Sequence, residues 1–266
     1  MRKLVLALGL TLLVTPAAAQ QCGNGPGGFN AWLGAFKERA VRTGIRRSTV
    51  NSALKGVTYS RRVIRFDRNQ RSFKLSFDAF WKRRVDRRMI NRGKSFIAKN
   101  RRMMSNIERR WGVPAPLLVS VWALETGFGR DSGNLPIMRS LATLAYDCRR
   151  SKFFTNELLA ALKIVDRGDM RASQMKGAWA GEIGQTQFLA ERYLNYAVDY
   201  DGDGRRDLMR SVPDVLASTA NWFARNGWRR GQPWGPGTAN YRVIAKWNRA
   251  RVYQKTIARL ADELAG

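Results

Sequence analysis

The fold is decided by the stretch Trp111-Gly-Val-Pro-Ala-Pro-Leu-Leu-Val-Ser-Val-Trp-Ala-Leu-Glu-Thr-Gly-Phe-Gly-Arg130. Proline suits the first helical position and glycine favours a helix end, so the pattern predicts a helix over residues 117–124, after Pro116 and before Gly127. One face of this helix carries the i, i+3, i+4 and i+7 positions, which are Leu118, Val121, Trp122 and Glu125. The sequence therefore predicts one carboxylate at the end of a buried apolar face.

Two effects are expected to raise the pKa of Glu125. Burial disfavours the charged form, and the negative end of the helix dipole repels it. Both effects make Glu125 a better proton donor near neutral pH. The alternative is an ordinary helix-end residue turned toward solvent or toward an arginine.

The N-terminus has the features of a secretory signal peptide over residues 1–19. Two basic residues precede an apolar run from Leu4 to Val14, and Ala-Ala-Ala19 supplies a cleavage site. The apolar run is too short to span a membrane. Gln21 stands before Cys22 where a lipoprotein signal has a small residue, so we expect a soluble periplasmic protein with a mature chain of residues 20–266.

The cysteine and histidine counts limit the chemistry. Cys22 and Cys148 are the two cysteines, and an oxidising compartment with an even count favours a disulfide between them over two buried thiols. Closing a loop of that size would stabilise the fold by up to roughly 4–5 kcal/mol in the chain-entropy model. The sequence contains no histidine, which excludes Ser-His and Cys-His nucleophile pairs and leaves acid–base chemistry to carboxylates.

The net charge is +28, and removal of Arg2 and Lys3 with the signal peptide would leave +26. Such an excess indicates a polyanionic partner: nucleic acid, an anionic membrane surface or an anionic cell wall. Export argues against nucleic acid. Many of the arginines are also expected simply to solvate helix surfaces.

Helical spacing dominates the chain and strand-like alternation is scarce, which indicates a mainly α protein. Helices are predicted over residues 29–40, 48–54, 153–165, 188–198 and 211–226, with Ser48 and Ser211 as caps, and one or two closing helices over 241–264. Residues 76–110 are strongly basic but keep an apolar stripe, and we expect two helices broken near Gly93. The mature length fits one large domain, with room for a small α subdomain inserted around residues 140–210.

Four motifs follow one another along the chain: Ala-Leu-Glu125-Thr-Gly-Phe-Gly, Ser140-Leu-Ala-Thr-Leu-Ala-Tyr-Asp with Arg149-Arg150, Ala-Gly-Glu-Ile-Gly-Gln-Thr-Gln187-Phe188, and Val198-Asp-Tyr-Asp-Gly-Asp-Gly. In this order they resemble the lytic murein transglycosylase B family. The resemblance covers most of the mature chain and implies a lysozyme-like α catalytic domain with added helices. It also implies a monomeric enzyme that needs no cofactor and acts on peptidoglycan glycan strands.

By this resemblance the reaction cleaves the bond between N-acetylmuramic acid and N-acetylglucosamine without water and leaves a 1,6-anhydro end. Glu125 matches the single catalytic acid, which then acts as base. One carboxylate suffices when the sugar's own 6-hydroxyl attacks, whereas a retaining hydrolase needs a second carboxylate about 5 Å away.

The resemblance further implies five substrate contacts that differ in chemistry. A Gln-Phe pair lines the cleft, an arginine pair lies near the saccharide and its acidic substituents, and an asparagine polarises the N-acetyl group. These positions are Gln187, Phe188, Arg149, Arg150 and Asn248.

Four positions depart from the family pattern. Trp222 and Trp247 stand where tyrosines are usual, which keeps an aromatic platform for sugars but loses its hydroxyl. Ala178 stands where members have a cleft serine, and Glu182 where they have a small residue. Glu182 raises a rival hypothesis of hydrolysis by two carboxylates; the alternative is a loop residue that faces solvent or pairs with an arginine.

An acidic loop reads like the first nine positions of an EF-hand calcium loop, with Gly204 at the sixth. Its candidate ligands for Ca²⁺ are Asp199, Asp201, Asp203 and Asp207. Arg210 occupies position twelve, where a bidentate glutamate belongs, so a plain Asp/Gly-rich turn is the alternative.

Three other functions stay open beside a lytic transglycosylase. One is a hydrolytic muramidase of the same fold. Another is an inactive peptidoglycan-binding protein, favoured by Ala178 and Ala250 at places where hydroxyls are expected. The third is a nucleic-acid-binding protein, which fits the charge but not the signal peptide.

Overall fold

The computed structural model describes residues 22–69 and 75–266, so the predicted signal peptide lies outside the described residues. Within these ranges the protein is mainly α, as predicted, with thirteen α-helices. In chain order they are α1 Phe29–Arg42, α2 Arg47–Ala53, α3 Arg61–Arg68, α4 Phe77–Arg84, α5 Arg87–Lys99, α6 Arg101–Trp111, α7 Ala115–Thr126, α8 Ile137–Tyr146, α9 Ser151–Arg167, α10 Ala190–Tyr196, α11 Val212–Arg225, α12 Ala239–Trp247 and α13 Arg251–Ala265. Two short strands, β1 Leu135–Pro136 and β2 Lys176–Gly177, pair antiparallel.

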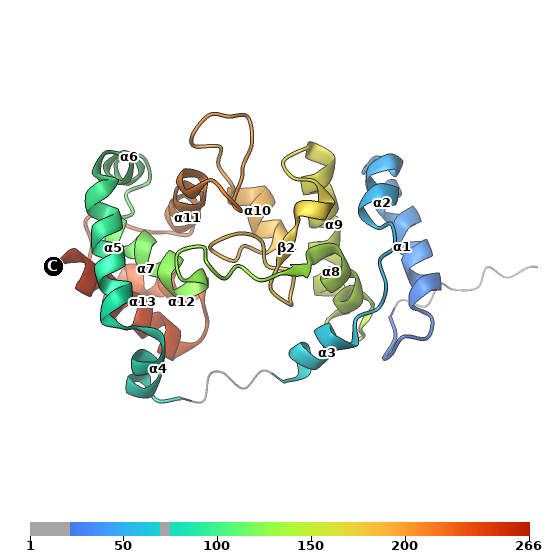
Figure 1. Ribbon diagram of the computed structural model, residues 1–266, viewed down its shortest axis with the longest axis horizontal. Coiled ribbons are helices and arrows are strands. Elements are labelled where there is room, and N and C mark those ends of the chain that lie inside the picture. The colour runs from blue at the N-terminus through green and yellow to red at the C-terminus, as the bar shows by residue number, and fades with distance from the viewer. Residues whose placement is uncertain (1–21, 70–74) are drawn as a thin grey trace, which may run out of the picture.

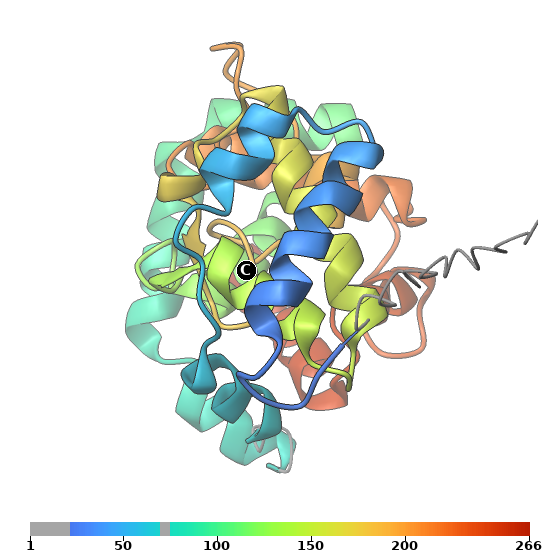
Figure 2. The ribbon, with the colours of Figure 1, turned by 90° about the vertical axis from the view of Figure 1, so that its right-hand side faces the viewer.

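The helices form two groups along the long axis of the molecule (Figure 1). One group places α7 against α5, α6, α11 and α13, and the other packs α9 against α8, α2 and α10. Seen from the N-terminal end, α1 and α2 lie over the α8–α9 pair (Figure 2). The segment around 140–210 therefore shares its packing with the N-terminal helices, and its role as a separate subdomain stays a prediction. No helix of the described residues is long and apolar enough to cross a membrane.

The predicted central helix is confirmed as α7, with Pro116 in its first turn and Gly127 as its left-handed C-cap at φ 58°. It is buried almost all round: ten of its twelve residues are buried. A helix that is apolar on every side belongs in the middle of a core, so the expectation of one buried face was too narrow.

Two predicted boundaries are wrong. Gly93 does not break a helix but lies inside α5, where an added Cβ would stand 2.6 Å from Leu264 Cδ2. Three helices rather than two form this segment, with breaks on either side of α5: before it the Asp86 carboxylate accepts the Met89 N–H at 2.7 Å and caps the helix, and after it Asn100 separates α5 from α6. Ser48 lies within α2 rather than before it, whereas Ser211 does cap α11 by accepting the Asp214 N–H at 3.3 Å.

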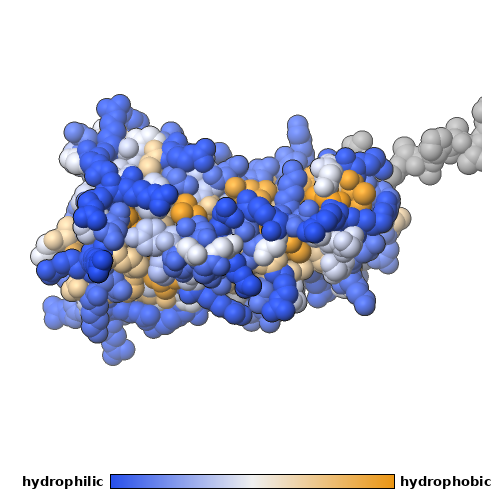
Figure 3. Space-filling model, turned by 90° about the horizontal axis from the view of Figure 1, so that it is seen from above, coloured by the Kyte–Doolittle hydropathy of each residue, from blue (hydrophilic) through white to orange (hydrophobic). Residues whose placement is uncertain are grey.

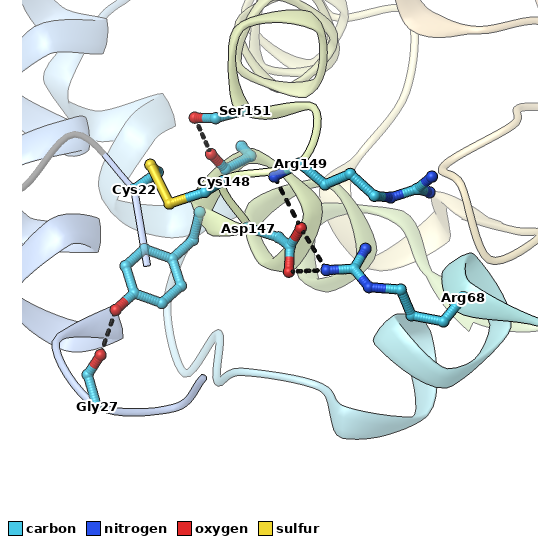
Figure 4. The surroundings of a disulfide bond; sticks show 9 residues. Cys22, Gly27, Arg68, Asp147, Cys148, Arg149 and Ser151 are labelled. Atoms are coloured by element: carbon cyan, nitrogen blue, oxygen red, sulfur yellow. Dashed lines mark hydrogen bonds and ion pairs between the residues drawn. A yellow bond between two sulfur atoms is a disulfide. The ribbon is translucent and has the colours of Figure 1, made fainter. Parts of the chain in front are cut away.

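A disulfide joins Cys22 to Cys148, with their Cα atoms 5.0 Å apart (Figure 4). Beside it the Gly23 N–H donates to the Tyr146 carbonyl at 2.8 Å. The cross-link fastens the start of the described chain to the end of α8. Because disulfides form and persist outside the reducing cytosol, this bond indicates an extracytoplasmic protein.

Candidate active site

Glu125 stands in the last turn of α7, half-buried at the inner end of the helix. The Trp247 indole at the end of α12 donates its Nε1–H to Glu125 Oε1 at 2.9 Å. Within residues 22–69 and 75–266, Glu125 forms no ion pair. The arrangement is neither the solvent-facing nor the arginine-paired alternative.

Burial raises the pKa of the Glu125 carboxyl above its ordinary value. The neighbouring Trp247, Tyr253 and Arg192 oppose this shift, while the negative charge of Glu182 adds to it. The net effect favours the protonated acid. A carboxyl in this state can donate a proton to a bound substrate.

Tyr253 and Arg192 belong to this site although the sequence pattern did not point to them. The Tyr253 hydroxyl is buried, and burial followed by the Glu125 charge raises the pKa of Tyr253 well above its ordinary value. Within residues 22–69 and 75–266, this hydroxyl has no hydrogen-bond partner of good geometry. Both residues reach Glu125 from helices distant in sequence, α13 and α10, and no local spacing signals such a contact.

The loop that follows β2 is fastened to α7 through Gln185. Its Oε1 accepts the Trp122 Nε1–H at 2.8 Å, and its carbonyl accepts the Thr126 hydroxyl at 2.6 Å. Gly129 fits against the same side chain, since an added Cβ would lie 2.3 Å from Gln185 Oε1. These contacts hold the loop beside the end of α7.

The structure brings Gln187 and Phe188 into this loop. Gln187 has the strained positive φ of 55° for a non-glycine residue, and its Nε2 donates to the Gly184 carbonyl at 2.9 Å. Strain of this kind costs about 1–3 kcal/mol and is concentrated at functional sites. Phe188 is fully buried, with its ring centroid 5.7 Å from that of Trp247.

Trp222 and Trp247 lie edge to face with ring centroids 4.9 Å apart. Both are buried, with 4% and 7% of their surface exposed, so in this conformation they offer little ring face to a sugar. The next residue, Asn248, accepts the Ala250 N–H at its Oδ1 at 2.9 Å. Contact of these three residues with a glycan stays a prediction.

Arg149 and Arg150 both pair with the buried Asp67, at the disulfide end of the molecule. Arg68 joins the same carboxylate at 2.6 Å and also bonds Asp147, as Figure 4 shows in part. The arginine pair is thus anchored by protein carboxylates. Its proposed contact with substrate depends on the side-chain surface that this pairing leaves exposed, 43% for Arg149 and 37% for Arg150.

Glu182 is half-buried, and its carboxylate accepts the Ala180 N–H at 3.0 Å. Burial raises the pKa of Glu182, and the charge of Arg150 partly offsets this. Among the described residues Glu182 has no ion-pair partner. A second carboxyl therefore lies within electrostatic reach of Glu125, and Ala178 in the same loop contributes no hydroxyl.

Three of the four predicted calcium ligands gather. One carboxylate oxygen from each of Asp199, Asp201 and Asp203 lies within 4.8 Å of the others, a group that could hold a metal ion. Asp207 is not in this group; its Oδ1 accepts the N–H groups of Met209 at 2.9 Å and Arg210 at 3.0 Å.

Helices α4 to α6 carry a dense positive charge. Their exposed cations are Lys82, Arg83, Arg84, Arg87, Arg88, Arg92, Lys94, Lys99, Arg101, Arg102, Arg109 and Arg110. Three acidic residues lie in the same helices and their junctions, Asp78, Asp86 and Glu108. Seen from above, the end formed by these helices is mostly hydrophilic (Figure 3).

Comparison with known proteins places this geometry in context. Residues 28–239 match the family described as transglycosylase SLT domain. The chain is 36% identical over 129 residues to membrane-bound lytic murein transglycosylase B of Escherichia coli strain K12. The aligned segment covers 47% of this chain and 36% of that protein. It thus spans little more than a third of that curated relative.

Among solved structures, SltB3 from Pseudomonas aeruginosa in complex with NAG-anhNAM-pentapeptide is similar with a TM-score of 0.84 and 32% identity, over 90% of this chain and 80% of that one. Escherichia coli Slt35 in complex with calcium is similar with a TM-score of 0.79 and 23% identity, over 95% of this chain and 98% of that one. The second similarity supports the predicted lysozyme-like lytic transglycosylase fold alone.

Proposed function

Because the chain belongs to the transglycosylase SLT domain family, we propose that it is an exported lytic transglycosylase of peptidoglycan. The substrate is the glycan strand, and the bond cleaved joins N-acetylmuramic acid to N-acetylglucosamine. The product carries a 1,6-anhydro end. In support, SltB3 is complexed with NAG-anhNAM-pentapeptide, a ligand that contains an anhydro-muramic unit.

Glu125 performs both proton transfers in this proposal. First its carboxyl donates a proton to the glycosidic oxygen, and the bond from that oxygen to C1 of the muramic sugar breaks. Then the Glu125 carboxylate takes the proton of the same sugar's 6-hydroxyl, whose oxygen bonds to C1 and closes the anhydro ring. Glu125 is protonated again at the end, and no water is consumed.

The observation that carries the proposal is the state of Glu125. Its carboxyl is half-buried at the end of α7, raised in pKa by burial, hydrogen-bonded by Trp247 and free of any arginine ion pair in the described chain. A protonated acid is what the first step requires. The Trp247 N–H then stabilises the carboxylate that the second step requires.

The test is digestion of purified peptidoglycan with the protein and with its Glu125→Gln variant, followed by mass spectrometry of the released fragments. Anhydro products, one water lighter than hydrolysed ones and absent with the variant, are expected. Anhydro products from the variant would remove Glu125 from the mechanism. No release by either protein would favour an inactive wall-binding protein.

A hydrolytic muramidase is the second candidate because Glu182 supplies another half-buried carboxyl whose charge acts on Glu125. A hydrolase of this kind would need Glu182 as nucleophile or as the base that holds a water. It predicts reducing ends that disappear in the Glu182→Gln variant. Anhydro products that persist in this variant would exclude it.

We also propose that the protein works in the periplasm as a monomer, without a membrane span. The Cys22 thiol is used in the disulfide and so cannot carry a lipid thioether. The cationic α4–α6 surface would hold the protein near anionic wall or membrane, and that attraction would weaken as salt rises.

Calcium binding by the Asp199, Asp201 and Asp203 group is a separate proposal, supported by their geometry and by the calcium complex of Slt35. The exposed cation of Arg210 at position twelve should keep the affinity below that of a complete loop. Calcium should raise the melting temperature of the protein and not that of an Asp201→Asn variant. An unchanged melting temperature would leave a plain acidic turn.

A further inference from the structure

Arg192 on α10 is held by aromatic rings rather than by carboxylates. Its Cζ lies 4.7 Å from the ring centroid of Trp247, 4.8 Å from that of Trp222 and 5.8 Å from that of Phe188. Within the described chain it makes no ion pair and its side chain donates no hydrogen bond. A half-buried guanidinium in this setting keeps its charge, on which the Glu125 carboxylate and the buried Glu157 carboxylate of α9 act from beyond ion-pair distance.

The same rings lead directly to the proposed acid. Trp247, which Arg192 covers, donates its Nε1–H to Glu125 Oε1 at 2.9 Å. Phe223 stacks on Trp247 with a centroid distance of 5.3 Å, so a cation and a stacked ring both pack against the indole. Arg192 therefore packs against the indole that bonds Glu125.

We propose that Arg192 is a positioning residue of this site: it fixes the indole that bonds Glu125, and its charge stabilises the Glu125 carboxylate left after proton donation. The inference rests on the proposed function and deepens it. An acid that must next act as a base needs its charged form to be reachable, and a nearby cation that forms no ion pair with it supplies that without removing the proton beforehand.

Four side chains act on Glu125 from the elements packed around it, and a fifth, Arg84, lies close by. Arg192, Trp247 and Tyr253 favour its charged form. Glu182 in the loop favours its neutral form, as burial does. Arg84 of α4 bonds the adjacent Leu124 carbonyl at 2.6 Å and contributes a further positive charge nearby.

The test compares Arg192→Met, which removes the charge, with Arg192→Lys, which keeps it. In a profile of kcat/KM against pH, the alkaline limb reports loss of the Glu125 proton. Removing a nearby cation raises the pKa of an acid, so Arg192→Met should move this limb upward by about one pH unit. Arg192→Lys should leave the limb in place and lower the rate through a looser indole.

Arg110→Met is the matched control, because Arg110 lies over Trp111 at 4.6 Å on the exposed surface of α6. It makes the same chemical change and should leave the limb unmoved. A limb equally unmoved in folded Arg192→Met would overturn the proposal. So would failure of Arg192→Met and Arg192→Gln to fold while Arg192→Lys folds, since Arg192 would then be structural.

A second readout needs no activity. Trp247 emission should follow the protonation of Glu125, so the difference between titrations with and without Glu125→Gln isolates that group. Arg192→Met should shift this difference titration upward with the same sign as the kinetic limb. An inactive wild-type protein with this shift would overturn the proposed function but support the role of Arg192, whereas an active protein without it would overturn the role alone.

Discussion

Glu125 and Asp67 are both carboxylates withdrawn from water, yet the protein sets them to opposite states. Asp67, 4% exposed, is surrounded by Arg68, Arg149 and Arg150, and although burial raises its pKa, those hydrogen bonds and charges lower it overall. Glu125 receives one indole N–H and no ion pair, so burial prevails and its pKa is raised. Fixed partners, rather than burial, decide which acid keeps its proton.

Glu125→Gln should give the largest effect. If this carboxyl performs both proton transfers, its loss should lower the rate by about 10³-fold or more, near the upper part of the range for general acid–base catalysis. Release of anhydro fragments per unit time measures this. A rate reduced by less than tenfold would show that Glu125 does not perform the proton transfers.

Asp67→Asn should chiefly destabilise the fold. Asp67 accepts hydrogen bonds from all three arginines, and a hydrogen bond to a charged group contributes about 1.5–3 kcal/mol, less here because the arginines are 37–43% exposed, so the expected loss is about 3–5 kcal/mol in total. Urea unfolding of this variant should be compared with Asp78→Asn, an exposed aspartate on α4. Equal midpoints for the two variants would mean that Asp67 is not the anchor of its arginines.

Replacing both cysteines by serine should lower the free energy of unfolding somewhat less than Asp67→Asn does. The Cys22–Cys148 bond flanks Asp147, which bonds Arg68, so the cross-link supports the same cluster. A loss of about 2–4 kcal/mol in free energy of unfolding is expected. Because Glu125 lies on α7, the folded variant should keep its activity at low temperature, and a matching loss of activity would contradict this separation.

The smallest expected effect is a rise in the free energy of unfolding of the Glu125→Gln variant. A raised pKa in the folded state means that Glu125 contributes favourably below the ordinary glutamate pKa of about 4.3, and that this contribution is lost as pH rises toward the folded value. Glu125→Gln should therefore gain stability relative to wild type between acid and neutral pH. Asp67, with its lowered pKa, should show the reverse, because its contribution is present at neutral pH and lost in acid.

The local sequence pattern predicted the helix ends and caps that are determined by residues close together in the chain. The limits of α7 followed from Pro116 and Gly127, and the cap of α11 from Ser211. Gly93 was misinterpreted because a helical glycine can either end a helix or allow a close approach, and only the partner Leu264 decides.

Long-range pairing was beyond the sequence pattern. Arg192 and Asp67 looked like two of many charged residues on helix surfaces, and nothing in their spacing showed that one faces aromatic rings and the other three arginines. Tyr253 read as one position in the stripe of a closing helix. Their roles depend on which helices pack together, and a single chain's periodicity does not specify that.

The most direct test of the central account, one carboxyl acting without water, is digestion of peptidoglycan in water enriched in ¹⁸O. The account predicts that the newly released muramic acid ends carry no ¹⁸O and are anhydro. Incorporation of one ¹⁸O at those ends would contradict it and would show that a water molecule attacks instead.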